Sequence, residues 1–341
     1  MPAFDSITAG RSSRILQLAL FIASVAWVFS SQALAERAGN GIAVRFNFVS
    51  LQFLLAALFF IFLLWLGFSI LQAISFGGKS SREILGLPER PTVKGEWAIG
   101  VAVGWGMVVA AIFPMALFGT LHIQWWTAPR AFWLAVINLA TIGASTLAEE
   151  IAFRGYPFRR LIEAIGPVGA TVVMSILFGL IHAFNPAATW SSVFMTMLAG
   201  VLLCVAWLRT HGLWIGWGLH FGWNASMGVL FGLPVSGFLG FSSVVQTRAI
   251  GHIWLTGGDY GPEAALFTVL VLLVGIGVLV RVTRDYSWHY TYEPIIAGGY
   301  PMDAPPPAEH TAMEQQTKPA PLVQIAPATP QSNSAEDEPK A

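Results

Sequence analysis

Polar residues that can perform hydrolytic chemistry lie inside hydrophobic stretches of this chain. They form three patterns, Glu149-Glu150-x-x-x-Arg154, Phe178-x-x-x-His182 and His220-x-x-x-Asn224. A charged residue within a bilayer costs about 2.5 to 3.5 kcal/mol even on a lenient insertion scale, so such residues are functional candidates. Carboxylates, histidines and an asparagine are the side chains that activation of water and stabilisation of an oxyanion require.

The first pattern follows helical spacing. Glu150 and Arg154 are four residues apart and share a helix face, where an ion pair reduces the cost of burying either charge. Glu149 is rotated by about 100 degrees from Glu150. We therefore predict that Arg154 neutralises Glu150, while Glu149 faces a cavity and is free to act as a base. The alternative is a pair of acids that caps a helix end at the membrane surface.

The other two patterns repeat this spacing, so Phe178 shares a face with His182, and His220 with Asn224. A lone histidine near the end of a span is usually an interfacial residue. The remaining histidines fit that interpretation because they lie in loops, near span ends or near the C-terminus; they are His122, His211, His252, His289 and His310.

Composition predicts the class of the protein. Hydrophobic residues make up 55% of the chain and charged residues 11%, whereas about a quarter of the residues of an average soluble domain are charged. We therefore predict an all-α, multi-spanning helical bundle embedded in a lipid bilayer. The formal net charge of zero gives no indication of a nucleic-acid partner. Cys204, the single cysteine, cannot form an internal disulfide and is predicted to be a small core residue.

Hydropathy divides the chain into three parts: an N-terminus of residues 1–14, a transmembrane bundle of residues 15–284 and a tail of residues 285–341. At about 20 apolar residues per span, the bundle contains eight candidates. They lie at approximately 15 to 35, 47 to 75, 97 to 119, 131 to 158, 166 to 184, 189 to 208, 212 to 233 and 264 to 281. The first is predicted to be a retained anchor, because its apolar run is long and has no clear processing site.

The distribution of Lys and Arg predicts that both termini are cytoplasmic, in a protein of the cell membrane. With that orientation the inside holds Arg11, Arg14, Lys79, Arg82, Arg90, Lys94, Arg154, Arg159, Arg160, Arg209, Arg281, Arg284, Lys318 and Lys340. The outside holds Arg37, Arg45, Arg130 and Arg248.

Two segments are predicted to lie outside the bundle. Residues 78–96 form a polar cytoplasmic loop with a short amphipathic piece near Ile84 to Leu87. The tail is predicted to be disordered, because residues 301–341 contain nine of the twenty prolines, six acidic residues and no aromatic residue.

Over roughly residues 131 to 233, the three patterns resemble those of the CAAX prenyl endopeptidase and bacteriocin-processing group of intramembrane proteases, often called CPBP or Abi proteins. The segment Gly257-Gly258-Asp259-Tyr260-Gly261-Pro262-Glu263 also resembles a loop seen in bacterial members. The resemblance implies hydrolysis of a peptide bond in a lipidated, membrane-anchored or hydrophobic substrate. The implied roles are Glu149 as the base that activates water, His182 as a holder of that water, His220 and Asn224 as stabilisers of the oxyanion, and Glu150 and Arg154 as supports.

The resemblance leaves the cofactor open. The group is commonly labelled metalloprotease, yet a water activated by glutamate without a catalytic metal has also been argued for it. Two histidines and a glutamate are possible zinc ligands, but the soluble zinc-protease signature H-E-x-x-H is absent. Neither a metal ligand set nor an oligomeric state is therefore assigned from the sequence.

Helix geometry adds one further expectation. If the helix that carries Glu149 ended at Phe153, Glu149 would lie roughly 6 Å from the cytoplasmic face, and His182 near the opposite face. The two side chains could not meet. If this helix continues through Arg154 to about Arg160, Glu149 lies roughly 16 Å deep. We therefore predict a long or tilted helix here and a water-accessible cavity at mid-depth.

Other functions fit these residues less well. Gly143-Ala144-Ser145 resembles the serine motif of rhomboid proteases, but Thr146 replaces the expected glycine, and the predicted spans lack the two aspartates of aspartic intramembrane proteases. The remaining alternative is a non-catalytic membrane scaffold or immunity protein whose polar cluster only holds helices together. The pairs Gly100/Gly104 and Gly218/Gly222 are predicted to be helix-packing positions.

Overall fold

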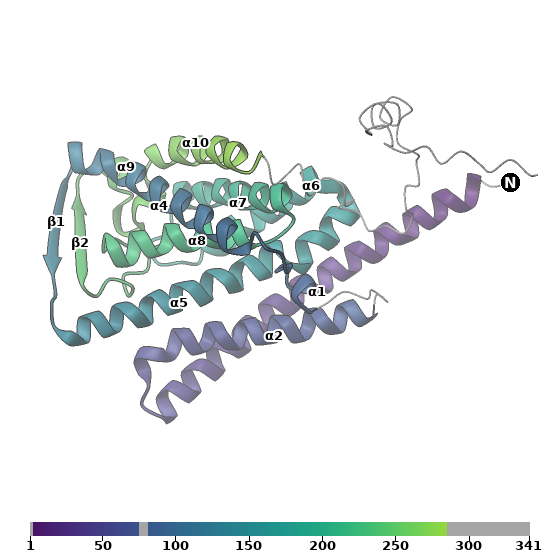
Figure 1. The fold of residues 1–341 in the computed structure, drawn as a ribbon, viewed down its shortest axis with the longest axis horizontal. Helices are drawn as coiled ribbons and strands as arrows, with labels where there is room; N and C mark the ends of the chain where they lie inside the picture. Colours follow the sequence, from purple (N-terminus) through teal and green to yellow (C-terminus); the bar gives the residue numbers. More distant parts are fainter. Residues whose placement is uncertain (1–2, 75–80, 285–341) are drawn as a thin grey trace, which may run out of the picture. The chain divides into compact units, whose positions relative to one another are not determined.

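The computed structural model describes residues 3–74 and 81–284 (Figure 1). Long helices dominate this part of the chain, as predicted. They are α1 (Ala3–Arg45), α2 (Gln52–Ile74), α4 (Val93–Phe118), α5 (Pro129–Arg154), α6 (Tyr156–His182), α7 (Trp190–Thr210), α8 (Trp214–Ala225) and α10 (Phe267–Val282). The shorter elements are η1 (Val49–Leu51), α3 (Ser81–Ile84), β1 (Thr120–Trp125), the π-helix η2 (Ser226–Leu230), β2 (Val245–Ile250), α9 (Ile253–Thr256), η3 (Gly258–Tyr260) and η4 (Pro262–Ala264). The predicted tail, 285–341, lies outside the described residues.

The helices have the length and composition of a membrane bundle, which confirms the predicted fold class. Among the described residues, five helical segments are long and apolar enough to cross a bilayer: Ser13–Arg45, Val49–Ile74, Val93–Phe118, Pro129–His182 and Trp190–Thr210. The predicted number of eight is not confirmed. α8 has 12 residues and continues directly into the five-residue π-helix η2, and it packs against α4, α5 and α7.

Glycines bring α4 and α8 into close contact, as predicted. A methyl group on Gly100 or Gly104 would overlap the carbonyl oxygen of Ile215 or Leu219, respectively. On the facing helix, a methyl group on Gly218 would overlap the carbonyl oxygen of Trp97. The two backbones approach to a distance that excludes a side chain, which is how small residues join helices in membranes. This contact sets the position of α8 and thereby of His220 and Asn224.

The α1–α2 pair packs beside α5 and α6 (Figure 1): α1 contacts α6, and α2 contacts α5. At the end where α4 begins and α7 meets α8, residues 85–91 form a strap. The backbone N–H of Leu213 donates to the Gly86 carbonyl over 2.9 Å, and the Trp214 indole donates to the Pro88 carbonyl over 2.9 Å. The strap holds the start of α8.

A two-stranded antiparallel sheet lies at the other end of α4 and was not predicted (Figure 1). β1 follows α4 and pairs with β2, with Leu121 opposite Ala249 and Trp125 opposite Val245. The Thr247 N–H donates to the Gly232 carbonyl over 2.8 Å, so the sheet is attached just beyond η2. Its two strands are more than a hundred residues apart in the chain, which is why local patterns did not reveal the pairing.

The prediction that the Glu149 helix continues to about Arg160 is wrong. α5 ends at Arg154, because Gly155 has non-helical backbone angles, φ −79° and ψ −125°. A new helix starts at Tyr156 and bends at Gly166, whose φ of 83° is in the left-handed region that favours glycine. The error was to equate the end of a helix with the membrane surface. Arg154 is fully buried, and it is therefore also not a marker of the cytoplasmic face.

Candidate active site

A buried ion pair lies at the end of α5. Arg154 Nη1 lies 3.3 Å from Glu150 Oε1, and both side chains have no exposed surface. Arg154 Nη2 also donates to the carbonyl oxygen of Gly200 on α7 over 3.4 Å. The predicted neutralisation of Glu150 by Arg154 is thus present, and the pair joins α5 to α7.

His220 connects this pair to Glu149. Its Nδ1 lies 2.9 Å from Glu150 Oε1, and since a carboxylate accepts, Nδ1 carries the proton of this hydrogen bond. The other ring nitrogen, Nε2, lies 3.8 Å from Glu149 Oε2. That oxygen is buried and has no hydrogen-bond partner among the described residues. An unpartnered buried oxygen beside a ring nitrogen is a position at which water binds favourably.

His182 is oriented in the same manner. Its Nδ1 lies 2.7 Å from the carbonyl oxygen of Phe178, one helical turn earlier in α6. A carbonyl oxygen only accepts, so Nδ1 again carries the proton and Nε2 is left for another partner. Both histidines therefore have one nitrogen held by the protein and the other available.

Phe178 brings the three motifs together. Its ring centre lies 4.2 Å from the Arg154 guanidinium carbon, 4.5 Å from the His182 ring centre and 6.2 Å from that of His220. A guanidinium over an aromatic face is a cation–π contact, which is stronger in a site without water. The sequence placed Phe178 in a motif, but it offered no role for it.

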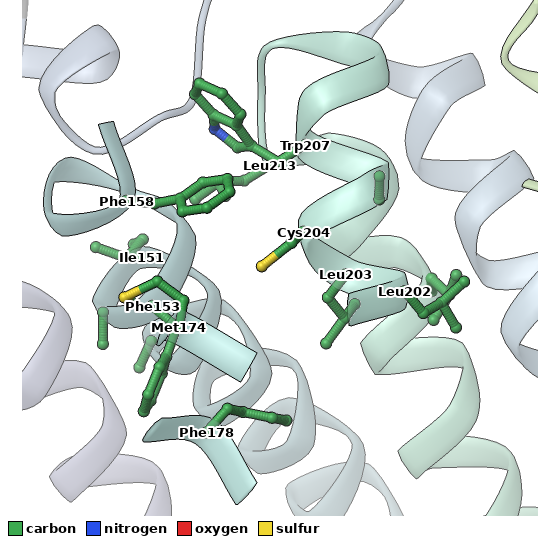
Figure 2. Packing of buried hydrophobic residues seen from close by; sticks show 14 of the residues in the cluster. Ile151, Phe153, Phe158, Met174, Phe178, Leu202, Leu203, Cys204, Trp207 and Leu213 are labelled. Atoms are coloured by element: carbon green, nitrogen blue, oxygen red, sulfur yellow. The ribbon is translucent and has the colours of Figure 1, made fainter. Parts of the chain in front are cut away.

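The polar cluster is supported by a hydrophobic wall. Figure 2 shows Phe153, Met174 and Phe178 on one side and Leu203 and Cys204 on the other. The ring centres of Phe153 and Phe178 are 5.1 Å apart, at an interplanar angle of 79°. Cys204 has no exposed surface, which confirms it as a small core residue. This packing restricts the rotamers of the residues that carry the polar groups.

A cavity of about 50 Å³ opens beside the two histidines, enough for a few water molecules. Its polar wall contains His182, His220, Asn224, Ser236 and Glu263. Its apolar wall includes Met107, Met195, Leu203, Leu219 and Leu272. Asn224 makes no hydrogen bond to another described residue, so its amide is available to a ligand. Glu149 is not among the residues that line this cavity; its side chain is 35% exposed, and its Oε2 lies 3.8 Å from His220 Nε2.

Glu263 is a residue of this site to which sequence reasoning assigned no role. It belongs to the loop Gly257–Glu263, which was noted only for its resemblance to a bacterial loop. Tyr260 of the same loop is 1% exposed, and burial together with the charge of Glu263 raises its pKa to about 12. The phenol is therefore neutral at physiological pH and contributes as a hydroxyl group.

The site does not gather a metal ligand set. In residues 3–74 and 81–284, no three His, Cys, Asp or Glu side chains are grouped closely enough to hold an ion. Glu149 and His220 are the candidate ligands that meet, whereas a catalytic zinc site usually has three protein ligands. The arrangement fits a water held between protein groups better than a metal ion.

Comparison with known proteins agrees with the motifs. Residues 129–226 match the family model described as type II CAAX prenyl endopeptidase, Rce1-like, which confirms the resemblance for this segment. The uncharacterized protein YyaK of Bacillus subtilis (strain 168) is 26% identical over 166 residues, which cover 46% of this chain and 50% of that protein. The chain thus spans about half the length of this curated relative. No solved structure matches the chain significantly.

Proposed function

We propose that this chain, whose residues 129–226 carry the Rce1-like domain, is an intramembrane endopeptidase that cleaves with a water activated by Glu149. One observation carries the proposal. The buried Glu149 Oε2 has no hydrogen-bond partner among the described residues, and it lies 3.8 Å from the available nitrogen of His220. Glu150 Oε2 also has no such partner, but the other oxygen of Glu150 is bound by Arg154 and His220, so Glu149 is the carboxylate that remains for a base.

The proposed reaction uses Glu149 together with His182, His220 and Asn224. Glu149 removes a proton from water as the water oxygen attacks the carbonyl carbon of the peptide bond. The available Nε2 of His182 accepts the second water proton in a hydrogen bond and orients the nucleophile. When the tetrahedral intermediate collapses, the carbon–nitrogen bond breaks and Glu149 returns its proton to the leaving amine.

The oxyanion of the intermediate is stabilised by two donors. The Asn224 amide supplies one N–H, and His220 supplies the other from Nε2. His220 must then carry both ring protons, because Nδ1 already donates to Glu150. This places a cation between Glu149 and Glu150. Arg154 and Glu150 act as supports that hold His220 in this orientation.

The surroundings of the site favour a substrate that reaches it from the membrane. The cavity lies among α4, α6, α7, α8 and α10, and its apolar wall suits a hydrophobic chain segment. We therefore propose a lipidated or membrane-anchored peptide or protein as substrate. The excess of Lys and Arg in the predicted inside loops supports a cell-membrane protein with both termini in the cytoplasm.

The test compares the purified full-length chain with Glu149→Gln in detergent and in liposomes. Prenylated peptides and unmodified hydrophobic peptides serve as substrates, and cleavage is followed by mass spectrometry. Removal of a general base lowers the rate by about 10² to 10⁴-fold. Glu89→Gln is the matched control, because Glu89 is 82% exposed in its pair with Arg82 and is not part of the cavity wall. It is expected to keep wild-type activity.

Each outcome of this test has a clear meaning. Cleavage that survives a chelator supports water held by protein groups, and loss of cleavage with chelator, restored by a divalent metal, would contradict it. Equal rates for the wild type and Glu149→Gln would remove Glu149 as the base. If no peptide is cleaved and Glu149→Gln strains keep the cellular phenotype of the wild type, the scaffold function is favoured.

A further inference from the structure

We infer that Glu263 is a positioning residue that holds the ends of the helices carrying His182 and Asn224 around the cavity. The inference rests on the proposed function and assigns a role to a carboxylate outside the three motifs. Glu263 lies in the cavity wall together with both of those residues. Its two oxygens are, however, occupied by protein donors, which distinguishes it from Glu149.

One oxygen of Glu263 holds α8. The indole Nε1–H of Trp223 donates to Glu263 Oε1 over 2.8 Å. Trp223 is 8% exposed and directly precedes Asn224. A hydrogen bond to this buried ring therefore limits rotation of α8 about its axis and, with it, the direction of the Asn224 amide.

The other oxygen holds the loop that faces α6. Glu263 Oε2 accepts from both the backbone N–H and the hydroxyl group of Ser236, the latter over 2.9 Å. The carbonyl oxygen of Ser236 accepts from Asn185 Nδ2 over 3.1 Å, and Asn185 follows His182 by three residues. Contacts therefore run from the end of α6 through Ser236 and Glu263 to Trp223 on α8.

The three donors that contact Glu263 require a carboxylate at this position. Trp223 Nε1, the Ser236 N–H and the Ser236 hydroxyl all donate, and an ionised carboxylate is the side chain that only accepts. A glutamine would place its NH₂ group against one of these donors. Glu263 is also unsuited to act as a base, because its oxygens are engaged, whereas Glu149 Oε2 is not.

The loop that carries Glu263 is shaped to deliver it to this position. Gly257, Gly258 and Gly261 have φ values of 74°, 63° and 104°, which side-chain-bearing residues rarely adopt. A methyl group on Gly261 would also overlap the carbonyl oxygen of Pro234. The Gly237 N–H donates to the Tyr260 carbonyl over 2.9 Å. This is a second contact between the loop that contains Ser236 and the loop Gly257–Glu263.

The test uses Glu263→Gln, Trp223→Phe and the double variant in the full-length protein. Misplacement of catalytic groups reduces turnover, so each single variant is expected to lower kcat by about tenfold to a hundredfold while KM changes less than about twofold. Both changes break the same hydrogen bond, from Trp223 Nε1 to Glu263 Oε1. The double variant should therefore be no slower than the slower single variant. Trp27→Phe is the matched control, because it removes an indole hydrogen bond of the same length away from α8, from Trp27 on α1 to the Leu63 carbonyl on α2.

Hydrogen–deuterium exchange gives a readout that does not depend on cleavage. Glu263→Gln should accelerate exchange in the peptides covering residues 183–189 and 233–238 and leave the peptide around Pro88 unchanged. Wild-type kcat together with wild-type exchange in Glu263→Gln would overturn the inference, as would losses of kcat that multiply in the double variant. If the wild type cleaves nothing, the proposed function fails. Hydrogen–deuterium exchange alone then decides whether Glu263 links α8 to the loop that contains Ser236.

Discussion

His220 Nδ1 donates to Glu150 Oε1 over 2.9 Å, and the same oxygen lies 3.3 Å from Arg154 Nη1. One carboxylate oxygen thus accepts from Arg154 on its own helix and from His220 on α8, 70 residues later in the chain. This explains the two adjacent glutamates of the first motif. Glu150 contacts both the histidine and the buried arginine, which leaves Glu149 for the proposed role of base.

Loss of Arg154 should destabilise the protein strongly. Arg154→Met leaves the buried Glu150 without its cationic partner, and breaking a buried pair in this way costs about 3 to 5 kcal/mol. The control is Arg82→Met, because Arg82 pairs with Glu89 at 3.1 Å with side chains that are 66% and 82% exposed. An exposed pair contributes about 0 to 1 kcal/mol. Thermal unfolding in detergent measures both variants, and equal shifts would contradict the burial argument.

Phe178 should affect turnover as well as stability. Phe178→Leu removes the aromatic face beneath Arg154, a contact worth about 2 kcal/mol when it is desolvated, and it also removes the ring that contacts His182. We expect a lower unfolding temperature together with a reduced kcat. Phe132→Leu on α5 is the control, because Phe132 is 52% exposed. Unchanged kcat in Phe178→Leu would show that the ring only fills space.

The contact between α4 and α8 should not tolerate a single methyl group. Gly218→Ala forces a clash with the Trp97 backbone, and overpacking of this kind costs about 1 to 3 kcal/mol. Gly106→Ala is the matched control, since a methyl group there meets no atom within 4 Å and alanine favours helix formation. Unfolding temperatures of the two variants are compared. A Gly218→Ala protein as stable as Gly106→Ala would refute the close packing.

Several features of the site could be predicted from the sequence because they depend on helix geometry alone. The spacing of Glu150 and Arg154 places them on one helix face, and the ion pair is present. The glycine pairs on α4 and α8 are packing positions, as expected. The membrane class followed from composition. Each of these conclusions rests on residues that are close together in the chain or on the apolar composition, which indicates a lipid environment.

The tertiary structure decided the relationships that connect distant segments. Local patterns cannot tell that His220 shares an oxygen with Arg154, that Phe178 contacts both, or that Glu263 joins the loop after α8 to Trp223. The backbone break at Gly155 also overruled the helical continuation that the depth argument demanded. The sequence by itself thus determined which polar residues enter the apolar region and on which helix faces they lie. Packing between helices decided which of them meet, because contact distances depend on how backbones far apart in the chain approach one another.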